Sequence, residues 1–211
     1  MNLNVSEIFS GLQAEGMYTG CPSIFLRLQK CTRNCSFCDT QYHKIGKSVP
    51  ISTISNMLNS QSLRTIVLTG GEPLLQWKAI VALSNLLKSF TFHIETNGDL
   101  LYSKKVSYSD LCRICKYVAI SPKELSVAKQ LHKELPSLLS KVLVDIKVVT
   151  DVKKIGVSMI PFATLLMPLT TNNVERDNVI RRDVWNYCVQ HNIRYSPRLH
   201  VEVWGYKCRG K

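Results

Sequence analysis

Three cysteines lie close together near the N-terminal end of the chain, in the segment KCTRNCSFCDT. Cys31, Cys35 and Cys38 have the spacing Cys-x3-Cys-x2-Cys, so their thiolates can converge on one metal centre. A tetrahedral zinc site needs a fourth ligand, for which His43 is the nearby candidate. A [4Fe–4S] cluster held by three cysteines instead leaves one iron open to bind a small molecule. The set of three therefore points to chemistry rather than to electron storage.

A glycine-rich turn follows the next predicted strand, with the sequence TGGEP at positions 69–73. Gly70 and Gly71 let the backbone approach a ligand closely, and Glu72 supplies a carboxylate that can pair with an ammonium group. Pro73 suits the first turn of a helix. Without the cysteines, the same segment would be interpreted as an ordinary strand-to-helix turn.

The elements that must position these residues follow from the pattern of the chain. Extended, β-branched segments alternate with amphipathic ones, which predicts βαβ units and a mainly parallel sheet. The predicted strands are Ser23–Leu28, Thr65–Thr69, Thr91–Glu95, Tyr117–Ile120, Lys141–Ile146, Thr164–Met167 and His200–Trp204. The predicted helices are Ile51–Leu63, Trp77–Ser89, Ser109–Cys115, Glu124–Leu135 and Asn173–His191.

Polar residues follow several of the predicted strands. Besides TGGEP, they are ETNG at 95–98 and SPK at 121–123, while Asp145 and Lys147 are expected to end a fourth strand. The carboxyl ends of parallel strands meet on one face of the sheet, where both barrels and open α/β sheets build their sites. Each segment alone is explained by loop punctuation. Together they predict one site built from several strands.

The composition is that of a folded protein and argues against a membrane protein. The 211 residues, 45% of them apolar, suffice for one domain over residues 1–211. Charged residues make up 20% and the mean hydropathy is −0.01, which argues against disorder. Apolar stretches fall short of the roughly 20 residues of a spanning helix, and the first residues do not resemble a signal peptide. We therefore expect a cytoplasmic protein whose eight cysteines are reduced.

The formal charge is +12, and most of the excess lies in residues 101–211. A basic surface attracts nucleic acid, but it equally attracts a small anionic substrate. The chain contains no recognisable nucleic-acid-binding motif beside this charge. We therefore expect no nucleic acid as the primary partner.

The cysteine spacing, with Phe37 before the last cysteine, resembles the signature of the radical S-adenosylmethionine (SAM) superfamily. The turn at 70–73 resembles the GGEP motif of the same superfamily. In that superfamily the open iron binds the amino and carboxylate groups of SAM, and an electron from the cluster cleaves SAM. The resemblance, with the modest length, implies an α/β fold with a mainly parallel sheet, a partial (incomplete) TIM-like barrel of the radical SAM type.

The segments at 6–16 (SEIFSGLQAEG) and 20–28 (GCPSIFLRL) resemble the opening of the 7-carboxy-7-deazaguanine synthases. The segments CDT at 38–40, TGGEP, ETNG, SPK, SPRLH at 196–200 and WG at 204–205 match in order, so the resemblance covers nearly the whole chain. It implies that 6-carboxy-5,6,7,8-tetrahydropterin becomes 7-carboxy-7-deazaguanine with loss of ammonia, in queuosine or 7-deazapurine biosynthesis. It also implies SAM as a regenerated cofactor, Mg²⁺, an electron-donor protein of flavodoxin or ferredoxin type, and a homodimer.

The same resemblance assigns roles by residue. Cys31, Cys35 and Cys38 would hold the cluster, and Thr40 would bind Mg²⁺, with Asp39 as the competing ligand. The residues implied for SAM are Phe37, Cys38, Asp39, Gly71, Glu72, Ser121, Pro122 and Lys123, with Glu95 and Asn97 as weaker ribose candidates. The residues implied for the substrate are Leu12, Gln13, Ala14, Glu15, Arg27, Thr69 and His200. No catalytic residue beyond the cluster and SAM is expected.

Two of these side chains match the substrate chemically. The carboxylate of Glu15 suits the guanidine-like edge of a pterin, and Arg27 can form a bidentate pair with the substrate carboxylate. Two residues depart from the family pattern, since Ala14 and Lys30 replace glycines. Cys112 and Cys115 form a CxxC pair inside a predicted helix, which favours packing over a redox site.

Two other functions remain open from the sequence. A short activating enzyme that makes a glycyl radical on a protein partner would share the cluster and the GGEP turn. It would not need the QAEG segment at 13–16, Arg27 or the SPRLH segment. A non-enzymatic, zinc-bearing basic module for RNA would explain the cysteines and the charge, but not the other motifs.

Overall fold

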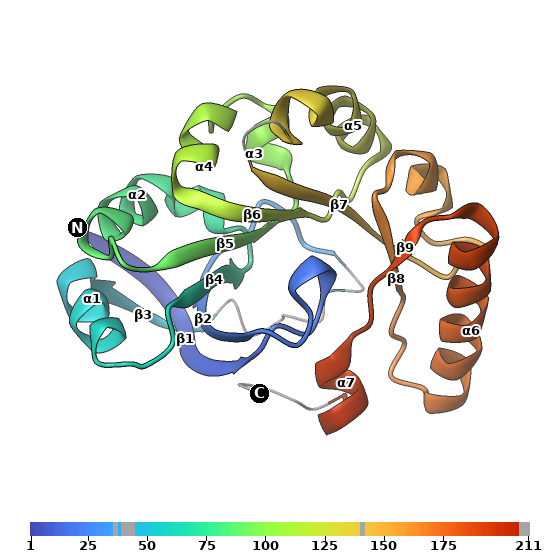
Figure 1. The fold of residues 1–211 in the computed structure, drawn as a ribbon, viewed down its shortest axis with the longest axis horizontal. Coiled ribbons are helices and arrows are strands. Elements are labelled where there is room, and N and C mark those ends of the chain that lie inside the picture. Colours follow the sequence, from blue (N-terminus) through green and yellow to red (C-terminus); the bar gives the residue numbers. More distant parts are fainter. Residues whose placement is uncertain (36–37, 39–44, 140–141, 207–211) are drawn as a thin grey trace.

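A curved, nine-stranded sheet organises the chain in a computed structural model that describes residues 1–35, 38, 45–139 and 142–206 (Figure 1). The strand order is β3-β1-β2-β4-β5-β6-β7-β8-β9. From β2 to β9 neighbouring strands run parallel, whereas β1 is antiparallel to both of its neighbours. Among the described residues the edge strands β3 and β9 do not pair, so the sheet is an incomplete barrel, as predicted.

The strands are β1 (Asn2–Leu12), β2 (Pro22–Leu28), β3 (Lys47–Pro50), β4 (Thr65–Gly70), β5 (Thr91–Thr96), β6 (Cys115–Ile120), β7 (Leu143–Thr150), β8 (Leu165–Pro168) and β9 (Arg194–Tyr195). The α-helices are α1 (Ile51–Asn59), α2 (Trp77–Leu86), α3 (Asp99–Tyr102), α4 (Tyr108–Ile114), α5 (Leu125–Leu139), α6 (Val174–His191) and α7 (Leu199–Trp204). Three 3-10 helices are η1 (Gly16–Tyr18), η3 (Pro73–Gln76) and η4 (Val157–Phe162).

The helices divide between the two faces of the sheet. Helices α2, α4 and α5 cover its convex, outer side, and η1 lies on its concave, inner side (Figure 1). The inner side is therefore the face left for polar chemistry.

Within the described part of the chain, no helix combines the length and the apolar composition that crossing a bilayer requires.

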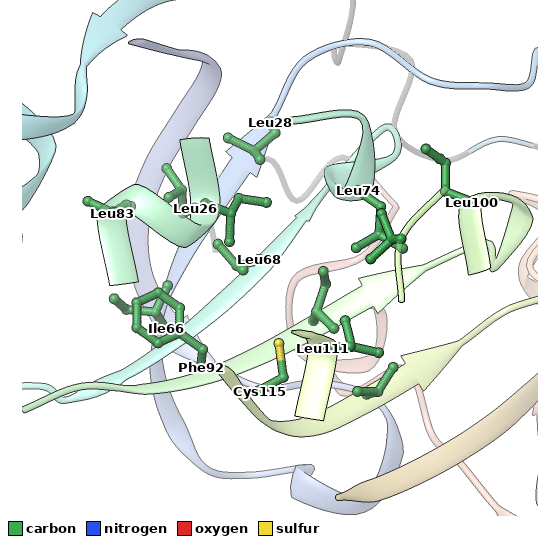
Figure 2. Close-up of a cluster of buried hydrophobic side chains, with 14 of the residues drawn as sticks. Leu26, Leu28, Ile66, Leu68, Leu74, Leu83, Phe92, Leu100, Leu111 and Cys115 are labelled. Atoms are coloured by element: carbon green, nitrogen blue, oxygen red, sulfur yellow. The ribbon is translucent and has the colours of Figure 1, made fainter. Parts of the chain in front are cut away.

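The main core lies between the outer face of the sheet and the helices, where leucine and isoleucine side chains gather (Figure 2). Side chains alternate between the two faces of a strand, so Leu26, Leu68 and Phe92 point outward into this core. The residues between them in sequence point inward. Hydrophobic burial thereby fixes which residues of each strand face the inner side.

Cysteines outside the KCTRNCSFCDT segment behave as small core side chains where they are buried. Cys115 lies in the main core, with Cys112 packed against it. Burial raises the pKa of Cys115 to about 12, so its thiol stays protonated and is a poor nucleophile. Cys188 belongs to a second cluster between α6 and the strands β7 and β8.

Two sequence-based expectations about the elements are wrong, and strands β1, β3 and β9 were not expected. Residues 200–204 form part of helix α7, although their alternating pattern favours a strand. The backbone N–H of Leu199, the first residue of this helix, donates a hydrogen bond to the carbonyl oxygen of Ala14. Such tertiary contacts override a weak strand propensity. Strand β7 continues to Thr150, so Lys147 lies within it rather than at its end. Strand β1 was not expected, because its middle residues lack a clear alternation.

Candidate active site

Polar side chains gather on the inner face of the sheet, on the strand positions opposite the core. Thr69 of β4 lies next to Arg27 of β2 in the parallel ladder. Glu95 of β5 lies in register with Ala119 of β6, which in turn aligns with Asp145 of β7. The strand pairing therefore forms one polar surface from four parallel strands, as the pattern of strand ends predicts.

Glu15 lies between two cations at the centre of this surface. Lys147 from β7 donates a short hydrogen bond to Glu15 Oε2, and Arg198 Nε lies 3.2 Å from Glu15 Oε1. All three side chains are largely buried. Burial alone would raise the pKa of Glu15, but the charges of Lys147 and then Arg198 hold it well below its usual range. Glu15 therefore stays ionised as a hydrogen-bond acceptor.

Glu95 forms a second anionic group on the same surface. Its Oε1 accepts a hydrogen bond from Gln13 Nε2 at 3.1 Å, and its Oε2 accepts one from Thr69 Oγ1 at 2.7 Å. Gln13 Oε1 also accepts from the backbone N–H groups of Ala14 and Glu15, which fixes the turn after β1. Glu95, predicted as a ribose ligand, thus lies beside Gln13 and Thr69, which are expected to bind substrate.

Lys147 is held between these carboxylates. Its burial would lower its pKa, but the charges of Glu15 and Glu95 outweigh this cost and raise it. A buried ammonium group between two carboxylates is an electrostatically matched arrangement. Lys147 therefore stays charged inside the site.

The C-terminal part of the chain joins the site through segment 196–200. Ser196 Oγ accepts from the backbone of Gly16 at 2.8 Å, and the backbone N–H of Leu199 donates to Ala14 at 3.1 Å. His200 Nε2 lies 3.5 Å from Arg198 Nη2. Residues from both ends of the sequence are therefore neighbours here.

A group of aromatic side chains forms the floor of the site. The ring of His93 lies tilted against Tyr18, 4.3 Å between centroids, and edge-to-face with Tyr117, 5.5 Å between centroids. Tyr117 donates a 2.7 Å hydrogen bond to Asp145, which also pairs with Arg194. Burial lowers the pKa of His93 to about 4, so this floor is uncharged at neutral pH.

Two of the predicted substrate residues lie at the margin. Arg27 Nε is 2.9 Å from Glu7 Oε1, its cross-strand neighbour on β1, and its guanidinium lies over the ring of Phe9. Leu12 is 49% exposed at the end of β1. Thus Gln13, Glu15 and Thr69 lie in the polar network, whereas Arg27 enters the site already paired.

The GGEP turn packs directly against the segment that begins the cysteine motif. A Cβ on Gly71 would lie 1.9 Å from the carbonyl oxygen of Lys30 and 3.1 Å from Cys31 Cβ. The backbone N–H of Glu72 donates to that same Lys30 carbonyl at 2.8 Å. Glycine is therefore required at position 71 by close packing rather than by an unusual φ.

The carboxylate of Glu72, which the sequence predicts to pair with an ammonium group, is held by hydrogen bonds within the turn and the end of β5. It is completely buried, and its oxygens accept from the backbone of Leu74 at 3.0 Å, Thr96 Oγ1 at 2.8 Å and the backbone of Asn97 at 2.8 Å. Burial raises its pKa to about 7, with the hydrogen bonds acting against that rise. The Glu72 carboxylate thereby ties the turn to the end of β5.

Cys31, Cys35 and Cys38 follow one another after β2, and Cys31 lies beside this turn. The backbone N–H of Cys38 donates to Cys35 at 3.2 Å, and burial raises the pKa of the Cys31 thiol. Among the described residues, no three His, Cys, Asp or Glu side chains lie close enough to hold one metal ion. The donor chemistry nevertheless fits a cluster, because three thiols follow one another beside a turn with no room for a side chain at Gly71.

The remaining predicted cofactor residues divide into two sets. Ser121 accepts from Lys123 Nζ at 2.9 Å, and its backbone N–H donates to Thr96 at 2.7 Å, which places segment 121–123 beside the end of β5. Pro122 between them is buried. Phe37, Asp39 and Thr40 lie outside the described residues.

Sequence reasoning missed three charged residues. Lys147 was noted as polar but expected beyond its strand, and Arg198 was noted only as part of the SPRLH segment. Arg33, inside the cysteine motif, was given no role. The available signal was that Lys147 lies in a strand most of whose residues are apolar and buried, where a lysine is unusual.

Comparison with known proteins agrees with this arrangement. The Radical SAM superfamily pattern matches residues 26–166. The 7-carboxy-7-deazaguanine synthase of Hyperthermus butylicus is 30% identical over 223 residues, covering 95% of this chain and 92% of its own. That of Pyrobaculum aerophilum is 30% identical over 224 residues, covering 99% and 97%.

Structural comparison supports the same fold. The crystal structure of QueE from Escherichia coli superposes with a TM-score of 0.65 at 22% identity and covers 95% of each chain. At this identity the likeness concerns the fold. Taken with the sequence matches, it follows that this chain belongs to the radical SAM superfamily and, within it, to the 7-carboxy-7-deazaguanine synthase family.

Proposed function

We propose that the chain converts 6-carboxy-5,6,7,8-tetrahydropterin into 7-carboxy-7-deazaguanine with loss of ammonia, using a [4Fe–4S] cluster and SAM. The observation that carries this proposal is the meeting of Gln13, Glu15, Arg198 and His200 on the inner face of the sheet. A general radical SAM enzyme needs the cysteine loop and the GGEP turn, but it has no need for this second, polar cluster.

The proposed recognition of the pterin uses complementary donors and acceptors. The 2-amino-4-oxo edge of a pterin presents N–H donors beside a carbonyl acceptor. Glu15, kept ionised by Lys147 and Arg198, accepts from the N–H groups. Lys147 and Arg198 then lie close enough to Glu15 to donate to the adjacent carbonyl. The carboxylate of Glu15 and its neighbouring cations together match the edge of the pterin ring better than either kind of charge alone.

In the same proposal Cys31, Cys35 and Cys38 hold the cluster next to the GGEP turn. When bound, the cluster supplies the electron that cleaves SAM. The backbone N–H groups of Gly71 and Glu72 already donate to the carbonyl oxygens of residues 28 and 30. The Glu72 carboxylate already accepts hydrogen bonds from the end of β5. What this turn offers to the ammonium group of SAM is therefore backbone carbonyl oxygen.

The other assignments of the sequence stand as parts of this proposal. Segment 121–123 and residues 37–39 contribute to SAM binding, and Thr40 binds Mg²⁺. A hydroxyl oxygen is a suitable hard ligand for Mg²⁺, which keeps most of its waters. Arg27, Leu12, Ala14 and Thr69 complete the substrate site.

The proposed partners follow from charge and chemistry. An acidic electron-donor protein of flavodoxin or ferredoxin type suits a chain with a formal charge of +12. We place the enzyme in the cytoplasm, since an iron–sulfur cluster with free thiols needs a reducing compartment. A homodimer is the proposed assembly, which sedimentation of the purified protein tests directly.

A product assay tests the function. The reconstituted, reduced protein is mixed anaerobically with SAM and the carboxytetrahydropterin, and the products are identified by mass spectrometry. The proposal expects 7-carboxy-7-deazaguanine and ammonia. Cleavage of SAM without that product would overturn the assigned reaction and favour a glycyl-radical activating enzyme. Zinc in place of iron and sulfide would favour the binding module.

A substitution at Lys147 tests the proposed recognition. Lys147→Met keeps the length of the side chain but removes the donor to the pterin carbonyl, so the KM for the pterin is expected to rise at least about tenfold. SAM binding is expected to be unchanged. The control is Lys104→Met, which removes an exposed lysine–glutamate pair with Glu134 away from the site. Equal KM values for both variants would contradict the assignment.

A further inference from the structure

Arg33 lies between the first two cysteines of the motif and joins three loops. Its Nε and Nη2 donate to the two carboxylate oxygens of Asp99, at 2.7 and 2.6 Å. Its Nη1 donates to Glu124 Oε1 at 2.6 Å. Asp99 begins α3 after β5, and Glu124 follows segment 121–123 after β6. One guanidinium therefore links the cysteine loop to the ends of two neighbouring strands.

A second set of hydrogen bonds reinforces this link. Thr32 Oγ1 donates to Asp99 Oδ2 at 2.8 Å and accepts from Asn97 Nδ2 at 2.8 Å. The backbone N–H of Asn97 donates to Glu72, in the GGEP turn. An uninterrupted network therefore runs from the cysteine loop through the β5 end to the turn that packs against Cys31.

The geometry of the network is specific to arginine. A planar guanidinium can donate two parallel hydrogen bonds to Asp99 and a third to Glu124, which a lysine ammonium cannot do in the same fixed plane. The side chains of Arg33 and Asp99 are only 21% and 18% exposed, whereas that of Glu124 is 57% exposed. Asp99 is therefore the stronger anchor, since exposed ion pairs contribute little.

The charge of Arg33 also has a local consequence. A guanidinium stays protonated in proteins, so Arg33 is a permanent cation beside Asp99 and Glu124. It neutralises the carboxylates that face the cysteine loop from α3 and from the start of α5. Without it, the added negative charge would disfavour an electron arriving on a cluster held by three thiolates.

We propose that Arg33 is a positioning residue of the cluster site, which holds the cysteine loop against the SAM-binding segments and keeps the local charge suited to reduction. The inference rests on the proposed roles of Cys31, Cys35 and segment 121–123. It is independent of the pterin chemistry, because Arg33 lies in the network of the cysteine loop and not in the network of Glu15.

Three variants test the proposal on the reconstituted protein. Arg33→Met removes both the positive charge and the planar guanidinium, whereas Arg33→Lys keeps the charge alone. Asp99→Asn removes the carboxylate charge that Arg33 pairs with, from outside the cysteine loop. Arg113→Met is the matched control, since Arg113 pairs with Asp110 in an exposed position away from the loop. Measured quantities are iron and sulfide content, the midpoint potential, and the change in the cluster's EPR spectrum on adding SAM.

The expected results differ between the variants. Arg33→Met weakens cluster retention and SAM binding by roughly 10-fold or more, as for other outer partners of metal ligands, and lowers the midpoint potential. Arg33→Lys restores the potential but not the retention, and Asp99→Asn weakens retention without lowering the potential. Potential and retention equal to those of Arg113→Met in all three variants would overturn the proposal. Absence of product from the unsubstituted protein, with its cluster and SAM response intact, would instead count against the proposed function and not against the role of Arg33.

Discussion

Glu72 and His93 are buried titratable side chains whose pKa values shift in opposite directions. Burial raises the pKa of Glu72 from 4.5 to about 7, and burial lowers the pKa of His93 from 6.5 to about 4. Both shifts favour the neutral form of the side chain in the folded state. Each therefore makes the free energy of unfolding depend on pH, and the two dependences have opposite signs.

The signs follow from which state holds the proton more tightly. Folded Glu72 binds its proton more tightly than the unfolded chain does, so its contribution is full below pH 4.5 and is lost as the pH rises toward 7. Folded His93 binds its proton less tightly, so its contribution is full above pH 6.5 and is lost as the pH falls toward 4. Between these limits the two slopes oppose each other.

The magnitudes nearly cancel. One pKa unit corresponds to about 1.4 kcal/mol, so between about pH 5 and about pH 7.5 the titration of Glu72 lowers the free energy of unfolding by about 2 kcal/mol. Over the same interval His93 raises it by about 2 kcal/mol. The unsubstituted chain is therefore expected to be almost equally stable at both pH values.

Two variants separate the opposing terms. Glu72→Gln removes the acid and leaves the His93 slope, so its stability is expected to rise by about 2 kcal/mol over the interval. His93→Phe keeps a ring against Tyr18 and Tyr117 and leaves the Glu72 slope, so its stability falls by about as much. The assay is urea unfolding of the protein before cluster reconstitution, and the double variant is expected to be flat again.

The comparison uses changes with pH, because Glu72→Gln also has a cost that is independent of pH. A glutamine amide nitrogen cannot accept the hydrogen bond from the backbone of Asn97, so this variant is less stable at every pH. The reasoning is refuted if either single variant shows the same flat profile as the unsubstituted chain. Slopes of the reverse sign would refute it equally.

Two further predictions concern the cofactor site. Gly71→Ala is expected to lower the free energy of unfolding by about 1–3 kcal/mol and to weaken SAM binding, because the new Cβ would meet the Lys30 backbone. Urea unfolding measures the first effect and SAM titration the second. Unchanged values would contradict the close packing at Gly71. Thr40→Val is expected to weaken the dependence of product formation on Mg²⁺ while SAM cleavage without substrate stays the same. An unaltered Mg²⁺ titration would count against Thr40 as the ligand.

The sequence predicted the sheet and its strand ends well, because these depend on local patterns. Apolar alternation identifies which side chains face the core, and punctuation after each strand marks the loops at one edge. The incomplete barrel and the meeting of Gln13, Glu15 and Thr69 follow from those patterns together with the family motifs. The short helix α7 could not be predicted from such patterns, because its sequence favours a strand and long-range contacts decide its conformation.

Pairing between charges could not be predicted, because it depends on register. Arg27 was expected to await a carboxylate ligand, yet the antiparallel pairing of β1 and β2 sets Glu7 opposite it, next to an irregularity between Val5 and Glu7. Likewise Lys147 reaches Glu15 only because β7 runs three residues beyond it and keeps it on the inner face. A shift of one residue in either strand would reverse both faces.

This pairing changes how the formal charge of +12 bears on substrate binding. On the described inner face, Lys147 and Arg198 are balanced by Glu15 and Glu95, Arg194 pairs with Asp145, and Arg27 lies against Glu7. The basic excess of the chain therefore attracts anions from the outside, but it does not provide an unmatched cation within this surface. A substrate that carries a carboxylate into such a balanced site needs positive charge of its own to accompany it. The proposed Mg²⁺ supplies that charge, so the electrostatics of the side chains give a reason for the metal that is separate from the family resemblance.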